Sequence, residues 1–233
     1  MNEAQFSVVL FTSPPPGMTS VEANAAAVKV DGRESLLRAV EMFLNREAIK
    51  QIQLCFLPEF AEEGKRKFGG HLGFSGVKVL SAGPKWIDQC VAAAEKLAAD
   101  ATHVVVHDAA RCAVPYSDLD ALLASAAHAQ ACCITAPLRA PLLEVDEGAA
   151  TALHPHSRFV QMLLPMCFSR ARFEQLVKDK KEPHASEFVL VKGSALNIRV
   201  GGGHDAGLAK AMLSLLPKPK MKAPSTPFEE AQW

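Results

Sequence analysis

Apolar residues along the chain fall into two patterns. Continuous apolar runs of strand length, rich in β-branched residues, cover 6–12, 52–57, 77–80, 102–107 and 131–138. Such runs are typical of strands that are buried on both faces of a sheet. Helical spacing of apolar residues covers 35–45, 86–99 and 117–129 instead. The alternation of strands and helices predicts a mostly parallel sheet with helices on both of its faces.

The second half of the chain carries a different signal. From 139 to 157 the pattern weakens around a turn at Asp146-Glu147-Gly148, which predicts a hairpin that projects from the body. Ser117, with Asp120 three residues later, predicts a capping box at the start of its helix. The remaining predicted elements are a strand at 158–164, a helix at 170–181, short strands at 188–193 and 196–200, and a closing helix at 204–216.

Composition narrows the class of protein. An apolar fraction of 49% in 233 residues is ample for one core, so we expect a single domain over 1–217 and a disordered tail over 218–233. The 25 basic and 25 acidic residues cancel, which argues against a nucleic-acid partner. The apolar runs are too short to span a membrane, and no basic leader precedes the first strand. The six cysteines lack CxxC spacing, which indicates reduced core thiols in a cytoplasmic protein.

The segment "THVVVHDAARCAVP", residues 102–115, carries the candidate chemistry. It places His107, Asp108 and Arg111 where a buried strand stops, and ligands of open α/β sheets gather at the carboxyl ends of strands. An aspartate there can hold a divalent cation, and an arginine can bind a phosphate or carboxylate. The alternative interpretation is structural: Asp108 closes a local turn and Arg111 pairs with it.

The same segment resembles the VHDAARP signature of the methylerythritol-phosphate cytidylyltransferase family, with His107 to Arg111 matching in full. Members of that family join a sugar-alcohol phosphate to CTP in isoprenoid synthesis. Other stretches are similar in the same order: "SVVLFTSPPPGM", "VDGRESLLRAVEMF", "SAGPKWIDQCVAAAEKL", "FVQMLLPMCF" and "VKGSALNIRVGGGHDAGLAKAML". The resemblance implies a doubly wound three-layer α/β/α sandwich of the nucleotidyltransferase type, with a projecting hairpin arm. It also implies a homodimer that exchanges arms.

The resemblance further implies roles for single residues. Asp108 and Asp205 would hold Mg²⁺, the implied cofactor. The phosphorylated substrate would contact Arg111, Arg199 and, from the arm, Arg158. Asp88, Ser13 and Gly17 would lie at the nucleotide. The alternative is that the retained residues are structural, with Asn197 and Asp205 capping the final helix region.

The chain departs from the family where the nucleotide binds. Pro14, Pro15 and Pro16 offer no N–H groups to a triphosphate, the loop arginine is missing, and 24–27 reads NAAA where the family has a Pro-Lys pair. Trp86 and Gln89 replace an arginine and a serine, "APLL" at 140–143 replaces a polar arm motif, and Leu164 and Met166 replace a threonine and a glutamine.

These departures predict a weak or inactive cytidylyltransferase, which could still bind a phosphorylated ligand or a partner protein. Two alternatives stay open. The chain could be an active nucleotidyltransferase with a changed nucleotide or sugar phosphate, using Lys29 or Lys85 as its cation. It could instead be a non-catalytic dimeric binding module. In the homodimer that the resemblance implies, Leu142, Leu143 and Val145 of the arm would pack against the partner.

Overall fold

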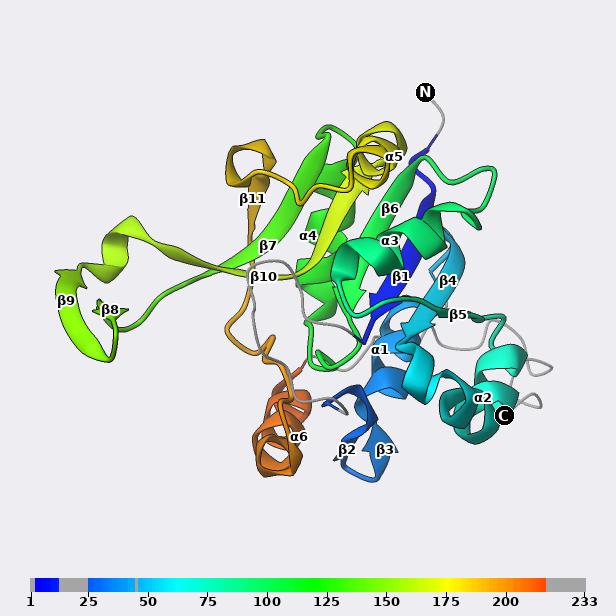
Figure 1. The fold of residues 1–233 in the computed structure, drawn as a ribbon, viewed down its shortest axis with the longest axis horizontal. Coiled ribbons are helices and arrows are strands. Elements are labelled where there is room, and N and C mark those ends of the chain that lie inside the picture. The colour runs from blue at the N-terminus through cyan, green and yellow to red at the C-terminus, as the bar shows by residue number, and fades with distance from the viewer. Residues whose placement is uncertain (1–2, 13–24, 45, 217–233) are drawn as a thin grey trace, which may run out of the picture.

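A seven-stranded sheet in the order β11-β7-β10-β6-β1-β4-β5 forms the centre of the computed structural model, which describes residues 3–12, 25–44 and 46–216 (Figure 1). Every neighbouring pair is parallel except those of β10, which runs antiparallel to both β6 and β7. The predicted, mostly parallel sheet is therefore confirmed. Its strands are β1 (Phe6–Phe11), β4 (Ile49–Phe56), β5 (Lys78–Ser81), β6 (His103–Asp108), β7 (Ala131–Pro137), β10 (Val160–Ser169) and β11 (Val189–Lys192).

Helices cover both faces of the sheet, which gives the three layers that we expected. Strand β1 shows how the apolar run is used: Val8 and Leu10 pack into one core, and Val9 and Phe11 into the other. Because successive side chains of a strand point to opposite faces, a run buried on both faces must be apolar throughout. The first core includes α1 (Ser35–Phe43), α2 (Pro58–Phe74) and α4 (Tyr116–Ala126); the second includes α3 (Trp86–Ala94) and α5 (Arg170–Asp179).

Helix α2 is an element that the sequence pattern did not predict. It contains four glycines, Gly64, Gly69, Gly70 and Gly73, and glycine is a poor helix former. Tertiary packing stabilises it instead, because Phe68 and Leu72 are buried in the core. A Cβ atom at Gly64 would lie 2.8 Å from Cζ of Phe56, so the absent side chain lets the helix approach the end of β4.

Two predicted local features are wrong. No side chain caps α4: the helix begins at Tyr116 after Pro115, so Ser117 lies within its first turn, and Asp120 forms an ion pair with Arg46. Residues 196–200 form no strand. They cross the end of the sheet, where the Val200 N–H donates to the Ala110 carbonyl over 2.9 Å. The 3₁₀ turn η4 (Gly203–Asp205) and helix α6 (Ala206–Leu215) follow.

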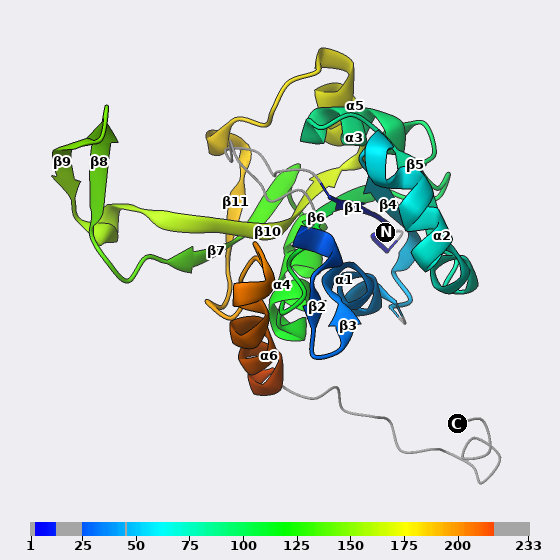
Figure 2. The ribbon, with the colours of Figure 1, turned by 60° about the horizontal axis from the view of Figure 1, so that its bottom comes forward.

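The predicted hairpin arm is present. Strands β8 (Leu142–Asp146) and β9 (Ala149–His154) form a two-stranded sheet of their own, which projects away from the body (Figures 1 and 2). Glu147 and Gly148 join them with φ angles of 45° and 84°. Two positive φ angles in a two-residue loop are the pattern of a tight hairpin turn, and glycine favours the second position. A smaller hairpin of β2 (Lys29–Val30) and β3 (Arg33–Glu34) follows the short turn η1 (Ala25–Ala27).

The six cysteines are all buried and free, as we predicted. Within the described residues, no helix combines the length and the apolar character that crossing a membrane requires. The expected tail from 218 lies outside the described residues.

Candidate functional site

The candidate site lies at the carboxyl ends of β1 and β6. From β1 the chain proceeds outward to β4 and β5 on one side, and β6 then pairs with the other side of β1. Strand order therefore reverses between β1 and β6, and such a switch point is where open α/β sheets bind ligands. Asp108, the last residue of β6, lies in register with Phe11, the last residue of β1.

A closed turn follows β6. Oδ1 of Asp108 accepts a hydrogen bond from the Ala110 N–H over 2.8 Å, and the Asp108 carbonyl accepts one from the Arg111 N–H over 2.9 Å. Nε2 of His107 lies 2.8 Å from the Arg111 carbonyl oxygen, so this nitrogen carries the proton and donates it. Burial lowers the pKa of His107 to about 4, which keeps the ring neutral. His107, Asp108 and Arg111 thus stand together because their contacts close this turn.

Asp108 pairs with Arg199 and not with the Arg111 side chain. Nε of Arg199 donates to Oδ2 of Asp108 over 2.7 Å, and the Asp108 side chain is 1% exposed. The Arg111 side chain instead donates a hydrogen bond from Nη1 to the backbone carbonyl oxygen of Asn197 over 2.8 Å. The alternative that Arg111 neutralises Asp108 within the turn is therefore wrong, although its backbone N–H does close that turn.

Three buried polar atoms at this site have no hydrogen-bond partner within the described part of the chain. They are Nδ1 of His107, the donor Nε of Arg111 and the acceptor Oδ1 of Asn197. Burial lowers the pKa of Arg111 from its ordinary value, the negative charge of Asp108 opposes this shift, and the positive charge of Arg199 adds to it. Buried polar groups are nearly always paired in folded proteins, so this donor and acceptor mark a place that a bound polar group could complete.

The carboxylates predicted to hold Mg²⁺ are already engaged. Asp108 uses both oxygens, one for Ala110 and one for Arg199, and Oδ2 of Asp205 accepts from the Gly201 N–H over 2.7 Å. Among residues 3–12, 25–44 and 46–216, no three His, Cys, Asp or Glu side chains gather as metal ligands would. The arrangement therefore does not fit a divalent ion held by protein carboxylates alone.

The residues predicted at the nucleotide are only partly described. Ser13, Gly17 and the three prolines lie outside the described residues. Asp88 is exposed in the first turn of α3, where its carboxylate lies close against Gly83: a Cβ there would be 2.6 Å from Oδ2. No hydrogen bond or ion pair within the described residues joins Asp88 to Asp108.

The two replacements beside Asp88 point into the protein. Trp86 is buried edge-on against Phe11, with ring centroids 6.1 Å apart, and its Nε1 donates to Glu182 over 3.1 Å. Gln89 is also buried, and its Nε2 donates to the Gly83 carbonyl over 3.3 Å. Both side chains are buried in the interior, so neither can replace the charged or hydroxyl group of the family motif.

Neither candidate substitute cation forms an ion pair with Asp108. Lys29 is largely exposed on β2, with Nζ 4.0 Å from Oε1 of Glu34, and Lys85 is exposed at the N-cap of α3. Within the described residues, Arg199 is the only ion-pair partner of Asp108. Arg158 is exposed in the short turn η2 (His156–Arg158) at the base of the arm and stays a prediction as a substrate ligand.

Sequence reasoning missed a second group of polar residues, on α2. Glu63 and Lys67 line a cavity of about 230 Å³ together with Phe60 and Thr12. The spacing of positions 60, 63 and 67 places them on one face of a helix, but this signal is visible only once α2 is known to be a helix.

The comparisons with known proteins agree with this fold. Residues 18–214 match the family described as IspD, 2-C-methyl-D-erythritol 4-phosphate cytidylyltransferase. The chain is similar to a protein of that name from Rhodopirellula baltica, with 24% identity over 91% of this chain and 96% of the relative.

Solved structures show the same architecture. The enzyme of Thermus thermophilus with the same name superposes with a TM-score of 0.69 at 20% identity, covering 89% of this chain and 98% of the other. The 4-diphosphocytidyl-2C-methyl-D-erythritol synthase of Anaerococcus prevotii gives a TM-score of 0.72 at 13% identity, covering 91% and 100%. At these identities the likeness establishes the fold.

Proposed function

Since the chain belongs to the 2-C-methyl-D-erythritol 4-phosphate cytidylyltransferase family over residues 18–214, we propose that it binds a phosphorylated small molecule beside Asp108 and transfers a cytidylyl group to it slowly or not at all. The family places the chain among cytidylyltransferases of isoprenoid biosynthesis. The residues on the sugar-phosphate side of the site support the binding, and those on the nucleotide side support the slow transfer.

The two guanidinium groups at the sheet edge support phosphate binding. Arg199 uses Nε for Asp108 and Arg111 uses Nη1 for Asn197, and each has further donors without a partner among the described residues. Two arginines and one carboxylate leave a net positive charge at the switch point. An arginine that keeps free donors in a planar fork matches the oxygens of a phosphate. This pair of arginines is the observation that carries the proposal.

The nucleotide side supports slow transfer. At positions 86 and 89, Trp86 and Gln89 replace the arginine and the serine of the family motif, and both side chains are buried in the interior. Removing one preorganised donor to a developing negative charge typically costs about 10²–10³ in rate. Several such groups differ here, so we expect CTP to bind weakly. Mg²⁺ enters this proposal only as a counterion of the phosphates that a nucleotide brings.

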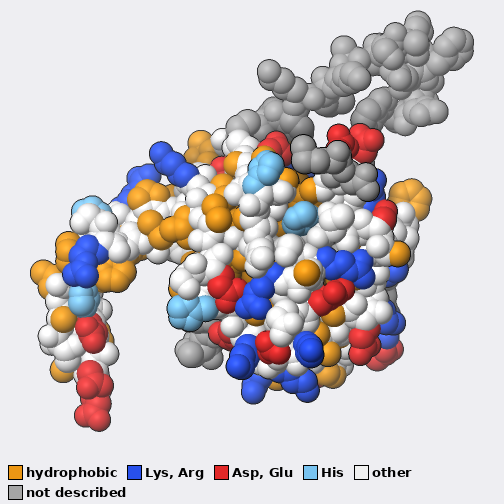
Figure 3. All heavy atoms as spheres, turned by 90° about the horizontal axis from the view of Figure 1, so that it is seen from above, with side chains coloured by type: hydrophobic (Ala, Val, Ile, Leu, Met, Phe, Trp, Pro, Cys, Tyr) orange, Lys and Arg blue, Asp and Glu red, His pale blue; other side chains and the backbone are white. Residues whose placement is uncertain are grey.

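The arm supports assembly into a homodimer. Leu143 and Leu153 form a cross-strand pair and are 61% and 68% exposed, and Val145 is 60% exposed. Figure 3 shows hydrophobic side chains on the surface of the projecting arm. A lone two-stranded hairpin is marginal in water, so these side chains need a surface to cover them. We propose that the surface belongs to a second copy of the chain. A cytoplasmic location stays a prediction.

Calorimetry with 2-C-methyl-D-erythritol 4-phosphate and, separately, with CTP and Mg²⁺ tests the proposal. We expect the sugar phosphate to bind and Arg111→Ala to weaken it by about 10- to 150-fold, since a charge-assisted contact is worth roughly 1.5–3 kcal/mol. Arg199→Lys, which keeps the charge but loses the fork, should weaken it less. Because Arg111 is buried, both variants are first checked for cooperative unfolding.

Other results would contradict this proposal or favour one of the alternative functions. Tight CTP binding, together with rapid release of pyrophosphate, would overturn the weakened nucleotide side. If Lys29→Ala or Lys85→Ala then abolished turnover, the alternative of an active enzyme with a relocated cation would hold. Absence of sugar-phosphate binding in a well-folded protein would favour the non-catalytic module.

A further inference from the structure

Helix α6 carries apolar side chains on two opposite faces. On the inner face, Ala209 is buried, and Leu213 packs beside it in a small core with residues of β2 and of the segment before α6. On the other face, Leu208 and Leu215 are 50% and 65% exposed. Residues seven positions apart lie on the same side of a helix, so the two leucines belong to one outer face.

The outer face of α6, which we define by Leu208, Ala211, Met212 and Leu215, is open to solvent. Ala211 between the two leucines is exposed, and Met212 is half-buried. Figure 2 shows α6 at the edge of the body, beside β2. The outward side of a surface helix is ordinarily polar, and an apolar side that no described residue covers marks a contact surface.

The chain around this face is positively charged, although the whole protein has no net charge. Residues 206–228 contain four lysines and no acidic residue. Lys210 pairs with Asp31 in the turn between β2 and β3 over 2.8 Å. The other three, Lys218, Lys220 and Lys222, follow α6 directly in the sequence. A basic run of this kind attracts an anionic surface.

An apolar helix face beside a run of lysines matches the chemistry of an anionic bilayer surface. The aliphatic side chains reach the boundary between headgroups and acyl chains, while the lysines contact lipid phosphates. Either signal alone gives weak attachment, and the two together are what stable peripheral binding requires. A soluble polyanion would attract the lysines but would gain nothing from the apolar face, so the combination favours a membrane.

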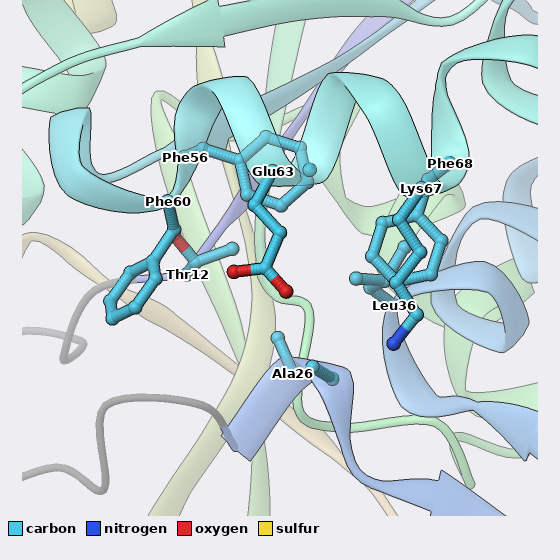
Figure 4. A pocket seen from close by; sticks show the side chains of 10 residues that line it. Thr12, Ala26, Leu36, Phe56, Phe60, Glu63, Lys67 and Phe68 are labelled. Carbon is cyan, nitrogen blue, oxygen red and sulfur yellow. The ribbon is translucent and has the colours of Figure 1, made fainter.

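We propose that α6 and the three lysines after it bind the surface of an anionic phospholipid membrane. The inner face of α6 stays packed on the body, so only the outer face enters the interface and the helix does not span the bilayer. This surface is separate from the sites described above. No residue of α6 lines the cavity on α2 (Figure 4), and the residues that hydrogen-bond to the Asp108 side chain precede α6 in the sequence.

Sedimentation of the full-length chain with phospholipid vesicles tests the proposal. One vesicle preparation contains phosphatidylcholine alone, and a second contains phosphatidylcholine mixed with phosphatidylglycerol, which is anionic. We expect the protein to sediment with the anionic vesicles and to stay in solution with the neutral ones. The bound fraction should fall as the salt concentration rises from about 0.1 M to about 1 M, because the Debye length shortens from about 10 Å to about 3 Å.

The electrostatic contribution is measured by replacing the three lysines after α6 with glutamine. We expect the partition coefficient onto anionic vesicles to fall by about 100-fold, since each lysine near such a surface contributes about fivefold. The matched control replaces the exposed lysines at 178, 180 and 181 with glutamine and so removes the same charge from another part of the chain. This control should bind the vesicles nearly as well as the wild type.

The apolar contribution is measured with the double variant Leu208→Ser, Leu215→Ser. The partition coefficient should fall by about 10-fold, because less aliphatic area is removed from water on binding. At least half of each side chain is exposed, so the variant should unfold at nearly the same temperature as the wild type. Phe74→Ser removes a 95% exposed apolar side chain from α2 and should bind the vesicles like the wild type.

Absence of sedimentation with anionic vesicles would overturn the proposal, and so would equal sedimentation with neutral ones. If the double serine variant bound as well as the wild type, the lysines alone would account for the attraction, and the outer face would not be a membrane contact. Displacement from the vesicles by soluble polyglutamate at a similar concentration of charge would instead indicate an acidic soluble partner. Sugar-phosphate binding should be unchanged in all of these variants, so the two proposals fail independently.

Discussion

Arg199 donates a hydrogen bond from Nε to Oδ2 of Asp108 over 2.7 Å, although the two residues lie 91 positions apart in the sequence. Their side chains are 11% and 1% exposed, so little solvent screens the pair. The bond ties the segment before α6 to the end of β6. It also keeps Arg199 at the sheet edge and leaves its remaining donors for the phosphate that we propose.

This pair should show strong energetic coupling. Arg199→Met would leave Asp108 buried without its cation, at a cost of about 3–5 kcal/mol in the free energy of unfolding. Asp108→Asn in the same chain removes the stranded charge, and its amide oxygen can still accept from Ala110. We expect the double variant to lose less stability than the sum of the two single variants, as measured by urea unfolding. Additive losses would show that the pair contributes nothing specific.

His107 predicts a pH dependence of stability. Burial lowers its pKa to about 4 from an ordinary 6.5, so the unfolded chain takes up a proton at a higher pH than the folded chain. Stability from this residue is therefore full above pH 6.5 and decreases as the pH falls toward 4, by up to about 3 kcal/mol. His107→Gln keeps a donor for the Arg111 carbonyl but does not titrate. Its unfolding free energy should decrease less between pH 7 and 4.5, and equal slopes would contradict this account.

Two glycines should respond oppositely to alanine. A Cβ at Gly193 would lie 2.2 Å from Cγ2 of Ile134, a fully buried residue, so Gly193→Ala should cost about 1–3 kcal/mol. Gly69 lies inside α2 with no atom within 4 Å of its added Cβ. Gly69→Ala should therefore stabilise the protein by about 0.5–1 kcal/mol. Thermal unfolding of both variants measures the contrast, and a destabilised Gly69→Ala would show that α2 needs its flexible backbone.

The arm should control the assembly state. Replacing Leu143 and Leu153 with glutamate puts two charges on the face that we propose to be covered by a partner copy. Light scattering should then report a monomer in place of a dimer, with the far-UV circular dichroism unchanged. Glu144→Gln and Thr151→Val, on the same hairpin, serve as the control. A full-length chain that is monomeric at micromolar concentration would remove the basis for this prediction.

The strands of the central sheet could be predicted because burial on both faces requires continuous apolar runs. Strands β1, β6 and β7 lie close to the predicted ranges for that reason. The hairpin arm was predictable from its turn residues, whose conformation glycine favours. These elements depend on residues that are near each other in the sequence.

The missed features depend on distant contacts. Helix α2 has a weak local signal because of its glycines and forms through packing of Phe68 and Leu72. Asp120 follows Ser117 at capping distance but pairs with Arg46, from before β4. The resemblance placed Asp108 and Arg199 on one face, yet it could not say that they would pair with each other. Local pattern carries no information on which of two arginines reaches a buried carboxylate.

The position of β10 between β6 and β7 has a consequence for synthesis on the ribosome. The β6 edge that faces away from β1 is completed at Asp108, but its neighbour begins only at Val160. At about 5–20 residues per second, the intervening roughly 50 residues take about 3–10 s to emerge. During that interval a very apolar strand has an open edge, which is the kind of surface that pairs with other chains. Slow translation between 108 and 160 should therefore increase aggregation of this protein more than slow translation before 103 or after 169.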